Sequence, residues 1–484
     1  MSINFDIYIS YLNKFDKIQL SGNYKIINKL KRIIGWQDEN FFMTYAYRKY
    51  GWDGWNSFIT DTNKAPYGSI SWIVDILKKE KINCYIDKNL FPVYDDYSFI
   101  KSIKTGEFKP RADQYDAVEK AIKSNRSVIV ASTSYGKSLV IYLLCSYHLQ
   151  YNRNTIIVVP TQALVEQMQK DIISYGYTGD INGIYAQKKR INSSITVITF
   201  QTLAKIPSIL TNFDNLIIDE CHRIKSKSLL KVIETWNKRY MTGFTGTLKE
   251  KSHEWSLAKA YIGKPHVITN TMKLIENKIV ANLTVNIIRL LYPKEIRQKY
   301  KNLYFRDELD FYYENEKRNL EILKIACEKN KTGMIAVKMI NHCIYLHELM
   351  EKYYPDRVVY EIRGNFNYRN REEFNSLDEL KPLIEEEEKA ILIVSLPVFS
   401  TGISLKNIYF GIMAASTKSY VTVIQTIGRG LRVNEVKKDF MFIDILDDLR
   451  EKTEDETYAY SHYLDRLSYY EENNFPIIKS SINL

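Results

Sequence analysis

The chain has 484 residues, of which 45% are hydrophobic and 26% charged, a balance typical of a soluble globular protein with about three domains. No stretch is apolar enough to span a membrane, and the first residues lack the form of a signal peptide. The five cysteines are scattered without zinc-site spacing, so we expect reduced thiols and a cytoplasmic protein. The net charge of +11 favours a polyanionic partner.

Residues 1–105 are rich in aromatic side chains and carry none of the motifs found further along. Arg48 and Lys49 precede Tyr50 and Trp52, and such a mixture of cations and rings can stack on bases or straddle a phosphate chain. Alternatively, the rings fill the small core of this domain, an interpretation we favour for the tryptophans. Arg48 and Lys49 remain candidate phosphate contacts.

Residues 131–138 read Ala-Ser-Thr-Ser-Tyr-Gly-Lys-Ser and stand between an apolar run at 127–130 and a helix-permissive run at 139–144. Strand, tight loop and helix are the context of a P-loop, which cradles a polyphosphate with backbone N–H groups. Lys137 is predicted to reach the β/γ-phosphates of ATP, and Ser138 to ligate Mg²⁺. Because Ala131 replaces the usual first glycine, the alternative is an ordinary strand-to-helix turn. The predicted nucleotide-binding residues of the loop are Ser132, Thr133, Ser134, Tyr135, Gly136, Lys137 and Ser138.

An apolar run at 216–218 leads into Asp219 and Glu220. A strand there would deliver both acids to the sheet edge where ligands bind. Asp219 is predicted to hold Mg²⁺, and Glu220 to orient and deprotonate the attacking water. Taken alone, the pair could equally be a strand that ends in solvated acids; together with the upstream P-loop it favours an ATPase.

Short β-branched runs alternate with helical stretches along most of the chain, which predicts parallel sheets and RecA-like α/β cores. We expect a first motor domain over 106–272, a second over 273–450 and a helical, tyrosine-bearing tail over 451–484. The expected strands include residues 128–130, 156–159, 196–199, 216–218, 283–291, 333–337, 358–362, 390–394 and 409–414.

Residues 425–432 read Gln-Thr-Ile-Gly-Arg-Gly-Leu-Arg. On a helix, Gln425, Arg429 and Arg432 would share one face, which could clamp a γ-phosphate as an arginine finger does. The alternative is a solvated basic face. A glycine on each side of Arg429 indicates close approach to another group.

Taken together, these segments resemble the motifs of superfamily 2 helicases and translocases, and they occur in the family's order. Residues 132–138 look like motif I, Asp219-Glu220-Cys221-His222 like the DECH form of motif II, and 425–432 like motif VI. The resemblance implies further roles. Gln114 is placed to read adenine, and His222, Thr245 and Thr247 are placed to couple the ATP and nucleic-acid sites. The implied backbone contacts to nucleic acid are Thr161, Gln162, Gln201, Thr202, Thr401 and Gly402.

The chain also resembles, from end to end, the UvsW type of bacteriophage helicase, which remodels branched DNA. This resemblance includes the Tyr-Gly-Trp-Asp-Gly-Trp segment at 50–55 and Arg318-Asn319. It implies a small α+β nucleic-acid-binding domain before two tandem RecA-like motor domains, with ATP and Mg²⁺ bound between the motors. It further implies branch migration, fork regression and unwinding of forked or four-way junction DNA, single- and double-stranded, in phage replication, recombination and repair. We expect a monomer in the host cytoplasm, with no membrane partner.

Two other interpretations use the same motor: an RNA or R-loop helicase, for which RNA–DNA hybrids would be a partner, and the motor subunit of a restriction-type translocase. The DECH sequence does not decide between RNA and DNA. A nucleic-acid-binding or assembly protein with an inactive ATPase is a rival of another class. Intact Lys137, Glu220 and Arg432 argue against it.

Overall fold

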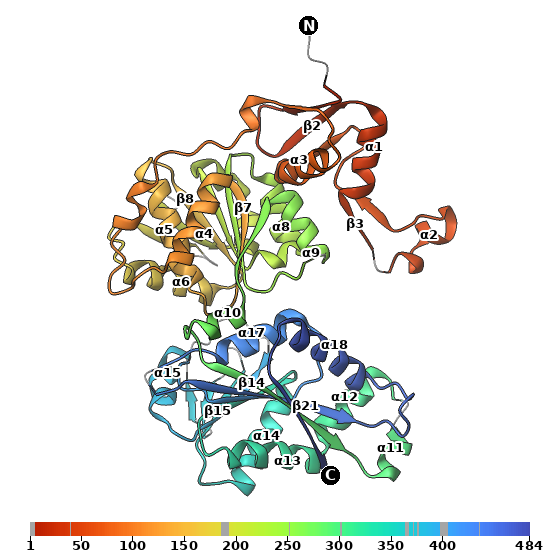
Figure 1. Cartoon of the computed structure of the whole chain (residues 1–484). Coiled ribbons are helices and arrows are strands. Elements are labelled where there is room, and N and C mark those ends of the chain that lie inside the picture. The colour runs from red at the N-terminus through yellow and green to blue at the C-terminus, as the bar shows by residue number, and fades with distance from the viewer. Residues whose placement is uncertain are drawn as a thin grey trace. The chain divides into compact units, whose positions relative to one another are not determined.

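The computed structural model describes residues 5–38, 40–184, 193–250, 252–300, 303–363, 367–370, 372–374, 377–396, 405–434 and 436–484. The chain divides into two compact units (Figure 1). The first runs to Ala131 and includes Gly136–Ile268; the second comprises Ser132–Tyr135 and Thr269–Leu484. Within the described ranges, we find no helix with the length and apolarity needed to cross a membrane.

The first unit begins with a small α+β region built on a four-stranded sheet of order β5-β2-β1-β6. A separate antiparallel pair, β3 and β4, carries a short arm that ends in α2 (Figure 1). The elements of this region are β1 (Ile7–Tyr11), β2 (Lys17–Gly22), α1 (Tyr24–Ile33), β3 (Gly35–Gln37), η1 (Phe41–Met43), α2 (Tyr45–Tyr50), β4 (Trp55–Ser57), β5 (Lys64–Pro66), η2 (Tyr67–Ser69), α3 (Ile70–Lys79), β6 (Cys84–Ile86), η3 (Lys88–Leu90) and η4 (Ser98–Ser102).

The same unit continues into a seven-stranded sheet of order β13-β7-β12-β11-β8-β10-β9, in which the strands from β7 to β9 run parallel. Strands β7, β8 and β10 are buried at every position, as expected where helices cover both faces of a parallel sheet. The elements are α4 (Ala112–Ser124), β7 (Arg126–Ala131), α5 (Lys137–Gln150), β8 (Thr155–Val159), α6 (Gln162–Ser174), β9 (Ile181–Ile184), β10 (Ile195–Thr199), α7 (Phe200–Lys205), η5 (Pro207–Asn212), β11 (Asn215–Asp219), η6 (Cys221–Lys225), α8 (Lys227–Thr235), β12 (Tyr240–Thr245), α9 (His253–Tyr261) and β13 (Lys264–Thr269).

The N-terminal region and the seven-stranded sheet share one hydrophobic core. Buried Arg126 on β7 donates to the carbonyl of Phe15 at 2.5 Å, and its guanidinium lies 4.8 Å from the ring of Tyr67. Gly68 packs so closely on α9 that a Cβ there would lie 2.7 Å from the carbonyl oxygen of Ala260. The region before residue 105 is therefore anchored to the first motor sheet, so its deletion would expose core side chains.

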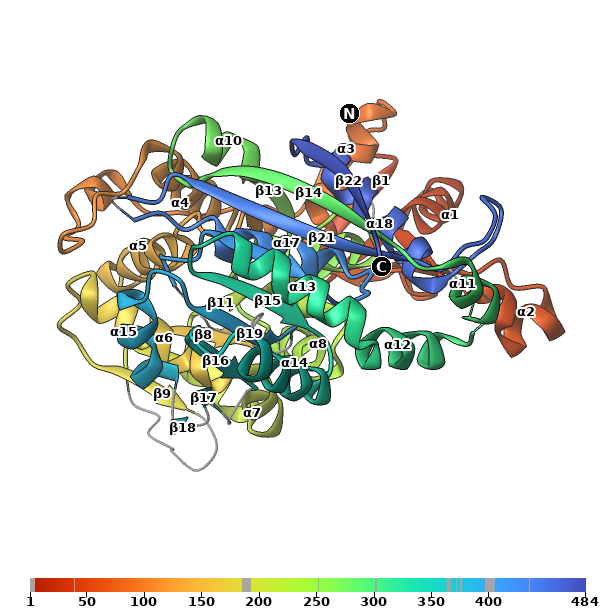
Figure 2. The same cartoon turned by 90° about the horizontal axis from the view of Figure 1, so that it is seen from below.

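The second unit contains a nine-stranded sheet of order β18-β17-β16-β19-β15-β20-β21-β14-β22. In this order the strands from β16 to β22 are parallel, and β17 pairs antiparallel with both β16 and β18. The long strands β14 and β21 lie side by side (Figure 2). The elements are α10 (Thr271–Glu276), β14 (Asn282–Leu291), α11 (Lys294–Tyr300), α12 (Phe305–Glu314), α13 (Glu316–Glu328), β15 (Gly333–Val337), α14 (Ile340–Tyr353), β16 (Val359–Ile362), β17 (Asn367–Arg369), β18 (Glu372–Phe374), α15 (Leu377–Glu386), β19 (Ile391–Ser395), β20 (Phe410–Met413), α17 (Tyr420–Gly430), β21 (Asp439–Asp448), α18 (Tyr458–Glu472) and β22 (Ile477–Asn483).

The predicted fold class is confirmed: two parallel-sheet α/β cores follow a small α+β region. The C-terminal tail differs from the prediction of a helical segment. It contains the helix α18 but then adds β22, which pairs in parallel with β14 as the edge strand of the second sheet. This pairing joins residues almost two hundred positions apart, which local sequence patterns do not report.

Candidate active site and nucleic-acid interface

The predicted motifs of the first unit meet at one edge of its parallel sheet. Strands β7, β12, β11, β8 and β10 are consecutive neighbours. Their register pairs Thr245 with Val130, Phe244 with Asp219, and Thr199 with Val159, so these strands end at one edge. Ligands of open α/β sheets bind at the carboxyl ends of the strands. The P-loop, both acids and the implied nucleic-acid contacts of this unit therefore follow these strand ends.

The P-loop connects β7 to α5 and uses two residues with left-handed backbone. Ser134 has φ 66° and Gly136 has φ 88°, and Gly136 is the N-cap of α5. The N–H of Tyr135 donates to the carbonyl of Ser132 at 3.2 Å, which closes a turn. Lys137 is the first residue of α5, followed directly by Ser138. This is the strand, turn and helix N-terminus that a phosphate-binding loop requires.

Gln114 contacts the P-loop from α4. Its Oε1 accepts from the N–H of Arg111 at 2.9 Å, and its Nε2 donates to the carbonyl of Gly136 at 3.4 Å. A Cβ on Gly136 would lie 2.8 Å from that Nε2, so the glycine leaves room for the amide. Gln114 thus supports the loop, and its role in reading adenine stays a prediction.

Asp219 and Glu220 lie where β11 ends. The N–H of Glu220 donates to Asp219 Oδ1 at 3.0 Å, and Glu220 has a left-handed φ of 52°. A non-glycine residue in this region is strained, and such strain is concentrated at functional sites. Burial, together with repulsion from Glu220, raises the pKa of Asp219 to about 7, although Lys137 partly opposes the shift.

This excess of negative charge fits a divalent cation. Carboxylate and hydroxyl oxygens, as on Asp219 and Ser138, are the hard ligands that Mg²⁺ prefers. In the part of the chain that the structure describes, no cluster of three or more His, Cys, Asp or Glu gathers to hold a metal. A Mg²⁺ ion held by Asp219 and Ser138 would keep coordination positions for phosphate oxygens and water.

His222 gathers the predicted coupling residues. Its Nδ1 lies 3.2 Å from Glu220 Oε2, 3.1 Å from Thr245 Oγ1 and 3.3 Å from Thr247 Oγ1. The N–H of Thr247 also donates to Thr245 Oγ1 at 3.2 Å. His222 is buried and satisfied, and it also links the acid that would position water to the end of β12. The coupling role of His222 stays a prediction.

The implied nucleic-acid contacts follow two neighbouring strands. Thr161 and Gln162 come after β8, and Gln201 and Thr202 come after β10. The two glutamines are exposed, whereas Thr161 caps α6 by accepting from the N–H of Leu164 at 3.4 Å. Thr202 is bonded to Thr199 through its hydroxyl at 2.8 Å. Gln162 and Gln201 are thus the more accessible members of this set. Thr401 and Gly402 lie outside the described residues.

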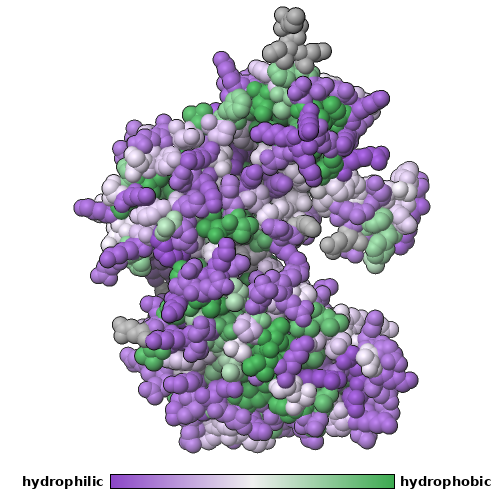
Figure 3. Space-filling model, in the orientation of Figure 1, coloured by the Kyte–Doolittle hydropathy of each residue, from purple (hydrophilic) through white to green (hydrophobic). Residues whose placement is uncertain are grey.

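Arg48 and Lys49 lie on the arm of the N-terminal region. The arm also exposes the rings of Tyr45 and Tyr50, whose exposed fractions are 67% and 71%. Lys49 Nζ lies 5.3 Å from both ring centroids. Trp52, by contrast, is half-buried and donates its Nε1–H to the carbonyl of Trp55 at 3.1 Å. The tryptophans therefore build the arm, while its tyrosines face outward; Figure 3 shows hydrophobic side chains on its surface.

The residues of the predicted arginine finger lie at the end of α17. Gln425 is buried within the helix and Arg429 stands in its last turn. The helix ends at Gly430, so Arg432 follows it and does not continue the predicted helical face. Gly430 packs on β21, where an added Cβ would lie 2.0 Å from the ring of Phe440. Gly430, one of the two glycines beside Arg429, therefore allows the close approach to another group that the sequence indicated.

Two residues outside the sequence motifs also support the site. Tyr175, at the end of α6, places its hydroxyl 2.8 Å from Ser138 Oγ, and burial raises its pKa to about 12. Buried Lys437 donates its ammonium to the carbonyls of Gly430 and Arg432, the latter at 2.8 Å. Neither residue belongs to a motif, and only the folded chain brings them to their partners.

Lys437 makes a pH-dependent contribution to stability. Burial, with a smaller effect of Arg432, lowers its pKa from 10.5 to about 7. Between these values the unfolded chain binds the proton more tightly, so stability rises with pH, by at most about 1.4 kcal/mol per pH unit. We expect the unfolding free energy of the wild type relative to Lys437→Met to increase between pH 7 and pH 9. Denaturant titrations at several pH values measure the unfolding free energy, and the exposed Lys438→Met serves as the control. A stability difference between wild type and Lys437→Met that does not change with pH would contradict the lowered pKa of Lys437.

The comparisons with known proteins agree with this geometry. The family model "Type III restriction enzyme, res subunit" matches residues 107–250. The chain is 26% identical over 505 aligned residues to the ATP-dependent DNA helicase uvsW of Enterobacteria phage T4, covering 98% of this chain and 99% of the relative. It is 22% identical over 325 residues to the probable helicase D10 of Escherichia phage T5, covering 66% and 67%. The crystal structure of T4 UvsW aligns over 99% of both chains with a TM-score of 0.50 and 23% identity, which shows a common fold.

Proposed function

We propose that this chain, an ATP-dependent superfamily 2 helicase of the UvsW type, remodels branched DNA by branch migration, fork regression and unwinding. The observation that carries the proposal is the row of strand ends in the first unit. From these strand ends the chain continues into Gly136, Lys137 and Ser138 of the nucleotide loop, into the two acids, and into exposed side chains that can grip a nucleic-acid backbone. The likeness to a DNA helicase over nearly the whole chain favours DNA as the substrate.

In the proposed reaction, Lys137 neutralises the β/γ-phosphates of ATP at the start of α5. Ser138 and Asp219 would hold Mg²⁺, which when bound offsets the phosphate charge. Glu220 accepts the proton of the attacking water. Its left-handed backbone and its contact with His222 hold the carboxylate in position for this step. Arg429 and Arg432 stabilise negative charge in the transition state, where positioned cations have their largest effect.

His222 is proposed to carry the outcome of hydrolysis from Glu220 to Thr245 and Thr247, at the end of β12. Gln162 and Gln201 are proposed to hold the DNA backbone without reading its sequence, which suits a motor. Thr161, Thr202, Thr401 and Gly402 complete the proposed set. We further propose that the protein acts as a monomer in the host cytoplasm.

A synthetic four-way junction with one labelled arm tests the proposal. In the presence of ATP and Mg²⁺ we expect conversion of the junction into two forked duplexes, resolved on a native gel. A non-hydrolysable ATP analogue should leave the junction intact. If the protein hydrolyses ATP but converts only RNA duplexes or RNA–DNA hybrids, branched DNA is not its substrate.

The exposed arm is expected to contribute to binding of the branched substrate. Base stacking on an aromatic ring contributes about 1–3 kcal/mol, so Tyr45→Ala combined with Tyr50→Ala should weaken junction binding about tenfold or more. Fluorescence anisotropy with a labelled junction measures the affinity. Tyr94→Ala, which removes another exposed ring of the same unit, is the control. Equal junction affinities of the arm variant and the control would show that the arm does not contribute to junction binding.

A further inference from the structure

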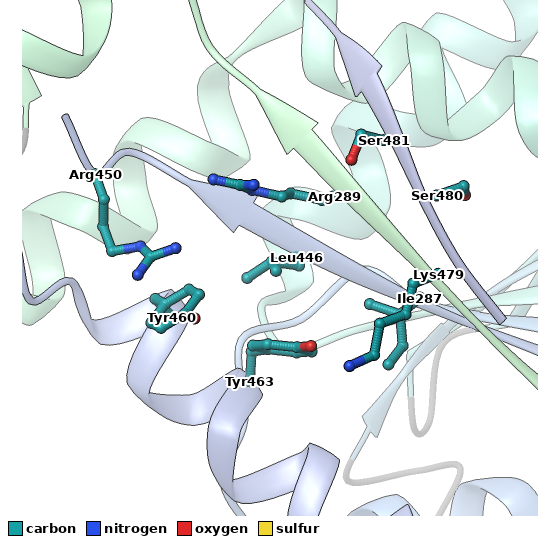
Figure 4. Close-up of a pocket in the computed structure, with 9 residues that line it drawn as sticks. All are labelled: Ile287, Arg289, Leu446, Arg450, Tyr460, Tyr463, Lys479, Ser480 and Ser481. Carbon is teal, nitrogen blue, oxygen red and sulfur yellow. The ribbon is translucent and has the colours of Figure 1, made fainter. Parts of the chain in front are cut away.

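A pocket of about 280 Å³ in the second unit is not used by the proposed reaction. It lies between α18 and the strands β21, β14 and β22 (Figure 4). The residues that line it are Ile287, Arg289, Leu446, Arg450, Tyr460, Tyr463, Lys479, Ser480 and Ser481.

The sheet register explains why these side chains meet. Arg289 of β14 pairs with Leu446 of β21 on one side and with Ser481 of β22 on the other. Ile287 likewise pairs with Lys479, so alternate residues of the three strands face the same side. α18 packs on that side of β21, where buried Arg466 binds Asp444 at 2.8 Å, whereas Lys479 to Ser481 of β22 are exposed. The edge formed by β14 and β22 therefore remains open at the pocket.

The pocket lining is strongly cationic. It contains Arg289, Arg450 and Lys479 and no acidic residue. Beneath it, buried Asp448 accepts from both arginines, with Oδ2 2.6 Å from Arg289 and 3.0 Å from Arg450. Two further carboxylates act on Tyr463: Asp444, which Arg466 neutralises, and exposed Glu471. Asp448 and Glu471 together do not balance three cations, so the pocket keeps a positive charge. Arg289 and Lys479 are its accessible cations, since Arg289 is 41% exposed in its side chain and Lys479 stands exposed on the edge strand. An anion is the favoured occupant.

Two aromatic rings complete the lining. Tyr460 and Tyr463 project from α18 one turn apart, with ring centroids separated by 5.6 Å. Arg450 lies against Tyr460, its guanidinium carbon 3.2 Å from the ring centroid, and this contact fixes one wall. Tyr463 faces the strands that carry Arg289 and Lys479 (Figure 4). Cations, hydroxyls and rings within one small pocket are the groups that hold a phosphate together with its sugar or base.

We propose that this pocket binds one nucleotide of a DNA strand, with the phosphate on Arg289 and Lys479 and the sugar or base against Tyr460 and Tyr463. The volume is near the lower limit of about 300 Å³ for ligand pockets, which suits a single nucleotide and excludes a duplex. The inference rests on the proposed function, because a DNA motor supplies the strand. The shared chemistry is a nucleoside phosphate, which a free nucleotide also offers.

Photo-crosslinking of the full chain tests the pocket directly. A single-stranded oligonucleotide containing 5-iododeoxyuridine is irradiated with the wild-type protein, and the linked peptides are sequenced by mass spectrometry. We expect a crosslink at Tyr460 or Tyr463. Lys479→Glu should lower both this crosslink and the single-strand affinity about tenfold and reduce the salt dependence of binding. Lys317→Glu is the charge-matched control: this exposed lysine belongs to α13, whose Arg318 binds Asp447 on the opposite face of the sheet.

The outcomes separate this inference from the proposed function. Tight DNA binding with crosslinks only in the first unit would contradict nucleotide binding in this pocket, while the helicase proposal would still hold. Absence of DNA binding by the wild type would overturn both. Added thymidine monophosphate distinguishes the source: a crosslink that survives it supports a DNA strand as the occupant. Because the crosslink itself places the strand in the pocket, its loss on adding thymidine monophosphate still supports a nucleoside-phosphate site. Binding of thymidine monophosphate to a wild type that gives no crosslink at Tyr460 or Tyr463 would overturn the strand as the occupant.

Discussion

Replacing Glu220 with glutamine is expected to lower kcat for ATP hydrolysis by about a hundred- to ten-thousandfold, the range lost when a general base is removed. Glutamine keeps the size of the side chain and can still contact His222 Nδ1, which lies 3.2 Å from the carboxylate. It cannot accept the proton of the attacking water. The loss therefore isolates proton transfer from the packing of the site.

Steady-state hydrolysis with and without DNA measures this effect, and a fluorescent ATP analogue reports whether nucleotide binding persists. Glu234→Gln makes the same change at an exposed position of α8 and should retain full turnover. If Glu220→Gln binds ATP and hydrolyses it within a few-fold of the wild-type rate, another group is the base.

Replacing Arg318 with methionine is expected to destabilise the second unit by about 3–5 kcal/mol, the usual cost of leaving a buried charge without its partner. Arg318 is 1% exposed and holds Asp447 through two hydrogen bonds, at 2.7 Å and 2.8 Å. It also donates to the carbonyl of Ala414 at 2.8 Å, which ties α13 to the end of β20. Burial alone lowers the pKa of Arg318, but Asp447 more than compensates and raises it overall.

Denaturant unfolding, monitored with a spectroscopic probe in the second unit, measures the loss of unfolding free energy caused by Arg318→Met. The double variant Arg318→Met with Asp447→Leu should recover most of it, because neither charge then remains buried alone. Lys324→Met, which removes an exposed ion pair with Glu321, should change stability by less than about 1 kcal/mol. A similar small change for Arg318→Met would show that this pair does not hold the unit together.

Several parallel strands were predictable because they are β-branched runs between turn residues, whereas the parallel strands β9, β21 and β22 were not among those expected. The expected strand at 333–337 coincides with β15, and that at 216–218 lies within β11. Spacing along the chain also placed Asp219 and Glu220 at a strand end, as the structure shows. These features depend on neighbours in sequence, so periodicity and motif order report them.

Features that depend on distant neighbours were not predictable. The parallel pairing of β22 with β14 and the hydrogen bond of Tyr175 to Ser138 join segments that are distant in the sequence. The donation by Lys437 to the carbonyl of Gly430 is closer in sequence, but it depends on the turn that follows α17. The end of α17 before Arg432 is a further case, since Gly430 packs on Phe440 and the chain then turns toward β21. Tertiary packing decides each of them.

The rate of ATP hydrolysis with different nucleic acids tests the central claim most directly. The purified chain is assayed alone and then with linear single-stranded DNA, linear duplex, a four-way junction and RNA, at equal nucleotide concentration and one salt concentration. We predict the strongest stimulation with the junction, because the motor then acts on branched DNA. Strongest stimulation by RNA, or no stimulation by any of the four, would contradict the claim.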